Sequence, residues 1–122
     1  MASSVLALRG ATTFDHDEAD HVGERVVELV GEMLARNGVD HDDVISILFT
    51  ATEDLTSTFP ATAARRLGLG DVPLICAREL SIENSMPRCI RVLMHLNTER
   101  SRTELRHVYL HDARALRDDL PE

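Results

Sequence analysis

Lysine is absent from this sequence, so all 13 of its basic residues other than histidine are arginine. The 21 acidic residues outnumber them, and the formal net charge is -8 at pH 7. A strongly acidic chain repels nucleic acid and anionic membrane surfaces, which argues against both as partners. An anionic ligand would have to bind where arginines gather locally, and the guanidinium group suits bidentate carboxylate recognition.

Aromatic residues and cysteines are also few. With no Trp, one Tyr and three Phe, the chain has little material for stacking the bases of single-stranded nucleic acid. Cys76 and Cys89 form no CxxC pair and no disulfide framework, so we expect a reducing compartment, the cytoplasm. Neither a signal peptide nor an apolar run of membrane-spanning length is evident.

The six histidines do not predict a metal site. His107 and His111 are four residues apart, but their segment looks extended, so they would not share a helix face. His16 and His21 lie among acidic residues at a helix start, and we expect both to be solvent-exposed surface residues. No HExxH motif and no zinc-finger spacing occurs.

Cofactor and nucleophile motifs are missing as well. The glycines form neither a P-loop nor a dinucleotide fingerprint, and Gly68 and Gly70 read as a loop. No base is evident in the sequence near Cys76 or Cys89, and Ser85 and Ser101 lack a nucleophile-elbow context. We therefore expect no metal and no cofactor.

Hydrophobic periodicity predicts one domain over residues 1–122, an α/β or α+β sheet layered with two helices. Asp15 and Asp17 are candidate N-caps for a first helix, which Asn37-Gly38 ends. Pro60 opens a second, short helix, and Pro73 indicates an edge strand or a strand start. Strands are predicted at 5–11, 44–49, 72–77 and 89–96, the second of them buried on both faces, with short extended segments at 107–110 and 113–116.

Two arginines stand where apolar residues would be expected. Arg9 ends an apolar strand, and Arg91 lies within the strongest strand, in the run CIRVLM. A charged group at such a position must be paired or must face a cavity. From the residues alone, a buried Arg91 paired with Glu79 or Glu104 is a sufficient explanation, and Tyr109 could be a core residue with a satisfied hydroxyl.

Several segments in register resemble the Bacillus-type chorismate mutases, the AroH class. The similarity covers nearly the whole chain in the same order, at RGATT (9–13), ATEDL (51–55), FPA (59–61), PLIC (73–76), CIRVLM (89–94), RHVYL (106–110) and LRDDL (116–120). The resemblance implies the α+β class, with a mixed sheet and helices on one face of it. It further implies a homotrimer that forms a pseudo α/β-barrel, with active sites between subunits. It also implies the Claisen rearrangement of chorismate to prephenate, for phenylalanine and tyrosine biosynthesis.

By this similarity, Arg91 would donate to the ether oxygen and the side-chain carboxylate of chorismate. Arg9 would clamp that carboxylate with help from Tyr109, and Glu79 would accept from the ring hydroxyl, near Cys76. Residues expected to line the apolar walls are Phe59, Ala61, Leu74, Ile75 and Leu116. Residues expected at the cleft mouth are Arg65 and Arg117. For these two, a solvent-exposed arginine without a functional role is nearly as good an explanation.

Three points qualify the resemblance. Thr62 stands where the family commonly has Lys, and the loop 81–88 lacks the family's glycines and carries Pro87. Cys76 and Glu79 are an odd number of residues apart, so a regular strand would point them to opposite faces unless it ends or bends.

Two rival functions remain open. One is an imine hydrolase of the YjgF/RidA type, which shares a trimeric architecture and an arginine in an inter-subunit cleft. The other is a trimer that binds a ligand without turnover, for which the altered cleft mouth at Thr62 is the only support.

Overall fold

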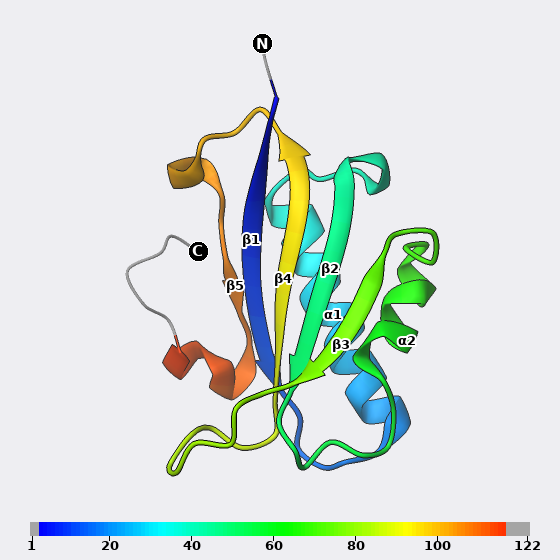
Figure 1. Ribbon diagram of the computed structural model, residues 1–122, viewed down its shortest axis with the longest axis vertical. Coiled ribbons are helices and arrows are strands. Elements are labelled where there is room, and N and C mark those ends of the chain that lie inside the picture. Colours follow the sequence, from blue (N-terminus) through cyan, green and yellow to red (C-terminus); the bar gives the residue numbers. More distant parts are fainter. Residues whose placement is uncertain (1–2, 117–122) are drawn as a thin grey trace.

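The computed structural model describes residues 3–116, and the five strands of this part form one mixed sheet (Figure 1). The strands are β1 (Ser4–Thr13), β2 (Val44–Ala51), β3 (Leu74–Arg78), β4 (Cys89–Thr98) and β5 (Val108–Tyr109). Their order across the sheet is β3-β2-β4-β1-β5. The central β4 is antiparallel to β1 and β2, while the outer strands β3 and β5 run parallel to their neighbours β2 and β1.

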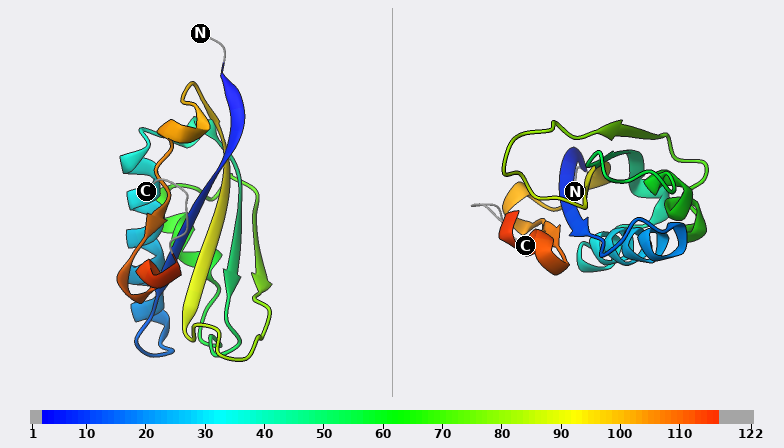
Figure 2. Two further views of the ribbon diagram at one scale, coloured as in Figure 1. Left: turned by 90° about the vertical axis from the view of Figure 1, so that its left-hand side faces the viewer. Right: turned by 90° about the horizontal axis from the view of Figure 1, so that it is seen from below.

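Helices α1 (Ala19–Arg36) and α2 (Pro60–Ala64) cover one face of this sheet, which confirms the expected α+β class (Figure 2). The buried side chains of α1 recur at helical spacing and pack into the main core: Val22, Val26, Leu29, Val30 and Met33. Pro60 occupies the first turn of α2, where its missing N–H costs no hydrogen bond. Within residues 3–116, no helix is long and apolar enough to cross a bilayer.

The opposite face of the sheet carries no helix in the part described and is rich in apolar side chains. Because side chains alternate along a strand, Val92 and Met94 of β4 face α1, while Arg91 and Leu93 face the other way. Val5 and Ile75 on this open face are 60% and 64% exposed. The expectation that 44–49 is buried on both faces is therefore wrong for one chain, since only the α1 side of β2 is fully covered.

The first helix is capped by a residue that the sequence did not single out. The Glu18 carboxylate accepts hydrogen bonds from the backbone N–H groups of Asp20 and His21, which lowers the pKa of Glu18. Asp15 and Asp17, the predicted caps, come too early in the chain. Asp15 instead pairs with Arg25 at 3.0 Å, and Asp17 binds the loop that follows β2.

Short 3₁₀ turns complete the fold: η1 (His41–Asp43), η2 (Arg65–Leu67), η3 (Arg102–Glu104) and η4 (His111–Leu116). The predicted edge position of 72–77 is confirmed, because β3 begins directly after Pro73 at one edge. The predicted extended segment at 113–116 is wrong. His111 adopts a left-handed φ of 54°, the chain turns, and the Ala113 N–H bonds the carbonyl of Leu110 at 3.1 Å.

Candidate active site

Arg91 projects from near the start of the central strand β4 onto the open face. Its register partners are Ala11 on β1 and Thr50 on β2. The Arg91 Nε lies 3.2 Å from the Glu79 Oε2, and the Thr50 hydroxyl donates to the same carboxylate. The sequence left Glu79 and Glu104 open as partners, and the structure selects Glu79. One arm of the guanidinium is thereby fixed by a charge-assisted contact.

Arg9 and Tyr109 share this face with Arg91. Ala11 is paired with Arg91 on one side and with Tyr109 of β5 on the other, and directly paired residues point to the same face. Arg9 is two residues from Ala11 and therefore lies on that face too. The backbone N–H of Arg9 donates to the buried His107 Nδ1 at 2.9 Å, which ties β1 to the segment that leads into β5.

Cys89 lies beside Arg91 and was not predicted as a site residue. It is two positions before Arg91 on the same strand face and is buried. Burial raises the pKa of the Cys89 thiol to about 11, although the neighbouring Arg91 acts in the opposite direction. Cys89 is therefore a neutral thiol at neutral pH and not a nucleophile. In the sequence, the spacing of two residues between Cys89 and Arg91 on a predicted strand was the signal that both side chains share one face.

A cavity of about 520 Å³ opens at the Arg91 end of this face. Its lining comes from three regions of the chain: Thr13 and Phe14, the loop residues 84–88, and Asp112 with Leu116 of η4, together with Arg91 itself. The structure thus brings Arg91 and Leu116, two of the predicted site residues, to one cavity. Tyr109, Ala11, Ala113 and Leu116 form a small apolar cluster separate from the main core.

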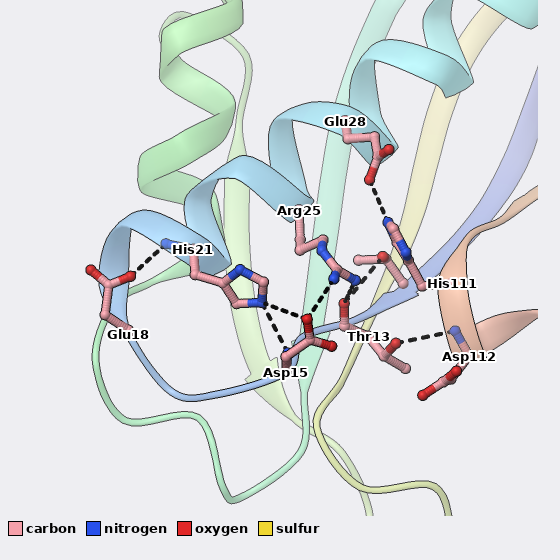
Figure 3. A network of polar contacts seen from close by, with 9 residues as sticks. Thr13, Asp15, Glu18, His21, Arg25, Glu28, His111 and Asp112 are labelled. Carbon is pink, nitrogen blue, oxygen red and sulfur yellow. Dashed lines mark hydrogen bonds and ion pairs between the residues drawn. The ribbon is translucent and has the colours of Figure 1, made fainter.

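Polar contacts hold the η4 side of this cavity in place (Figure 3). The His111 Nε2 lies 2.7 Å from the Glu28 Oε1 on α1, and the Asp112 N–H donates to the Thr13 hydroxyl at 3.3 Å. The guanidinium of Arg25 donates to the Thr13 carbonyl at 2.8 Å. Helix α1, the end of β1 and η4 are therefore joined around Thr13. The metal reading of His111 finds no support, because its partner is a single carboxylate.

The same network fixes the turn between β1 and α1. The Asp15 N–H donates to the His21 Nε2 at 2.9 Å, while the Asp15 carboxylate binds Arg25 (Figure 3). The His16 and His21 rings stack with centroids 4.5 Å apart. The two histidines are parts of this turn, and within the described residues no cluster of three potential metal ligands occurs.

The remaining predicted residues lie elsewhere in the chain. Phe59 and Cys76 line a second groove of about 470 Å³, between β3 and the loop 51–60. Leu74 and Cys76 point toward the helices and pack on the core, whereas Ile75 points to the open face. Ala61 is buried in α2 and Arg65 is exposed in η2. Arg117 lies outside the described residues.

The odd spacing of Cys76 and Glu79 therefore has a structural consequence. β3 ends at Arg78, and the Glu79 N–H still bonds the Ala51 carbonyl at 2.9 Å, so the alternation of faces continues to Glu79. Within one chain, Cys76 lies on the helix side, while the Glu79 carboxylate reaches Arg91 on the open side. Cys76 and the Arg91–Glu79 pair therefore lie on opposite faces of the sheet.

Comparisons with known proteins agree on one family. The family model for chorismate mutase type I matches residues 5–120. The chain is 44% identical over 117 residues to a chorismate mutase AroH of Thermus thermophilus, with 95% of this chain and 96% of that protein covered. It is 35% identical over 117 residues to a chorismate mutase AroH of Bacillus subtilis, with 95% and 92% covered.

A solved structure shares the fold. A chorismate mutase from Clostridium thermocellum superposes with a TM-score of 0.88 at 43% sequence identity, covering 90% of this chain and 98% of that one. The matched region contains every predicted site residue, from Arg9 to Arg117. The chain therefore belongs to the type I chorismate mutases, a family of isomerases.

Proposed function

We propose that this chain rearranges chorismate to prephenate, with Arg91 as the donor to the ether oxygen that gains charge as its bond to carbon breaks. The observation that carries the proposal is the Arg91–Glu79 pair on the open face beside a cavity of about 520 Å³. Of the five N–H donors of a guanidinium, the Nε–H faces Glu79. Terminal N–H groups can then serve the ligand from a fixed position.

The reaction needs orientation and electrostatic stabilisation more than acid–base chemistry. One carbon–oxygen bond breaks and one carbon–carbon bond forms within the same molecule, so no nucleophile, proton transfer or cofactor is required. Holding the side chain of chorismate over its ring contributes by removing unproductive conformations. Preorganised donors at the developing oxyanion contribute the larger share. Arg9 and Tyr109 serve the carboxylate of that side chain in this mechanism.

We further propose that the working site lies between two subunits. The open face of the sheet carries Arg9, Arg91, Tyr109 and Glu79, with Leu116 in the cavity beside Arg91. Phe59 and Cys76 line the separate groove between β3 and the loop 51–60. A neighbouring copy that presents its groove to this cavity would complete one site. The copy that carries the groove would then also contribute four predicted binding residues to this site: Ala61, Arg65, Leu74 and Ile75.

A homotrimer fits the open face of the sheet. Val5 and Ile75 are more than half exposed there, and Phe59 in the groove is 70% exposed. Large apolar side chains left exposed on a sheet face without a helix support a partner that covers this face. Closed rings repeat one heterologous contact, and a threefold ring would give three equivalent sites. The cytoplasm, suggested by the two unpaired cysteines, remains the proposed location.

The decisive test is incubation of the purified chain with chorismate while its absorbance is followed and prephenate is identified. We expect turnover without added metal, unchanged by a chelator. Loss of activity with a chelator would contradict the cofactor-free mechanism. An imine-generating substrate is assayed in parallel, because hydrolysis of that substrate alone would favour the rival enzyme. Tight binding of chorismate without prephenate would favour a binding protein.

A further inference from the structure

Backbone strain gathers around the cavity beside Arg91. Among residues 3–116, three non-glycine residues have a positive φ: Asn84 at 66°, Arg88 at 48° and His111 at 54°. Asn84 and Arg88 line this cavity, and His111 precedes Asp112, which also lines it. Left-handed backbone at non-glycine residues is unfavourable and tends to occur at functional sites.

Arg88 is the unusual member of the three. Asn and His tolerate a positive φ better than most residues, and Gly adopts it without steric cost. Arginine has no such preference, so its left-handed backbone is unfavourable. The conformation of Arg88 is held from both sides. Its N–H donates to the Asp54 Oδ2 at 2.9 Å, and its carbonyl accepts from the Phe14 N–H at 3.0 Å. Pro87 restricts the chain just before it.

The Arg88 side chain has no structural task that accounts for this arrangement. It is exposed, and within the described part of the chain its guanidinium makes no ion pair. The cavity that it lines also contains Arg91, whose Nε is engaged by Glu79, and the carboxylate residue Asp112. An arginine without an ion pair that lines a cavity together with a second arginine is suited to binding an anion there.

We propose that Arg88 is a further substrate-binding residue, whose guanidinium binds a carboxylate of chorismate in this cavity. The inference rests on the proposed function, since it assumes a dianionic substrate there. Arg88 supplies positive charge from the same chain as Arg91, on the loop that departs from the family pattern. It thereby offsets the charge that Thr62 removes from the cleft mouth.

The test separates binding from backbone strain by replacing Arg88 with residues that accept a positive φ. Arg88→Gly and Arg88→Asn both remove the charge without new strain. We expect KM for chorismate to rise about 10-fold in both, the scale of one charge-assisted hydrogen bond, with kcat within about twofold of wild type. Arg88→Lys should retain most of the wild-type affinity.

Arg36→Gln is the matched control, because it removes the same charge from the far end of α1, where Arg36 pairs with Glu32. Its KM should stay within about twofold of wild type. Unchanged KM in Arg88→Gly and Arg88→Asn, with an active wild-type enzyme, would overturn the inference and leave the proposed function standing. An equal rise in Arg36→Gln would also overturn it, since the effect would then be one of net charge. A wild-type enzyme without chorismate turnover would overturn both proposals.

Discussion

Arg91 is the residue on which the proposed chemistry depends. Its guanidinium is oriented by Glu79, which is itself held by the Thr50 hydroxyl, so the donor is in place before a ligand arrives. Preorganisation of this kind is effective because the protein does not have to reorient its dipoles during the reaction.

Arg91→Ala should lower kcat by about 100- to 1,000-fold, the effect of removing one preorganised donor at a developing oxyanion. Initial rates of chorismate loss at saturating substrate would measure it. Circular dichroism checks that the variant is folded. Turnover close to that of wild type in a folded variant would rule out the role assigned to Arg91.

Asp17 is a residue whose charge state bears on stability. Hydrogen bonds from Thr56 and Ser57 to its carboxylate lower the pKa of Asp17 from 3.8 to about 2. Because the folded-state pKa is below the unfolded value, the contribution of Asp17 is complete above about pH 4 and is lost as the pH falls toward 2. These contacts anchor the loop that leads to Phe59.

Asp17→Asn should therefore reduce stability near neutral pH and flatten the loss of stability between about pH 4 and pH 2. Thermal unfolding of both proteins from pH 6 to pH 2 gives the comparison. Glu18 and Glu104, whose pKa values are also lowered, titrate in both proteins, so the difference between the curves reports Asp17. Parallel curves would contradict the assignment.

At the scale of elements, the contact between β1 and α1 is tight. A Cβ added at Gly10 would lie 2.5 Å from the Met33 sulfur and 3.2 Å from the Leu29 Cδ1, and both side chains are fully buried. The glycine therefore lets the helix approach the strand that carries Arg9 and Ala11 on its opposite face.

Gly10→Ala should destabilise the fold by about 1–3 kcal/mol, the usual cost of overpacking a core. Urea denaturation would measure the change. Gly31→Ala is the matched control within α1, because nothing lies within 4 Å of its added Cβ, and there alanine should stabilise by about 0.5–1 kcal/mol. Equal midpoints for the two variants would mean that close packing does not explain Gly10.

The order of strands and helices followed from sequence periodicity, but several ends of elements did not. The predicted caps Asp15 and Asp17 were close to Glu18, yet only the geometry of the turn decides which carboxylate meets the N–H groups of α1. The segment 113–116 contains no strong periodic signal. Its 3₁₀ turn depends on the left-handed His111 and on contacts with Glu28 and Thr13, which are distant in sequence.

At the scale of the whole molecule, the split between the two groups of site residues leads to a test of assembly. Arg91→Ala disables the Arg91 side of a site. Phe59→Glu places a carboxylate in the groove, and it should fold because Phe59 is 70% exposed. Each variant alone is expected to have at most about 1% of wild-type activity toward a dianionic substrate.

Refolding the two variants together should restore activity to about one quarter of the sites, because a mixed contact can pair an intact Arg91 side with an intact groove. Activity of the mixture and of each variant alone, at equal total concentration, provides the measurement. Each variant refolded by itself in the same procedure serves as the control. If the mixtures are shown to contain both variants in one oligomer and still recover no activity, each complete site must lie within one chain.

The sequence alone determined the family, the α+β class and the alternation that places Arg9 and Arg91 on strands, because these depend on local pattern and on matched segments. Only the tertiary structure decided that Glu79, and not Glu104, meets Arg91, and that Cys76 lies on the other side of the sheet from both. Such choices depend on the register between strands far apart in sequence, and on where a strand ends. Side-chain type and spacing along the chain do not carry that information.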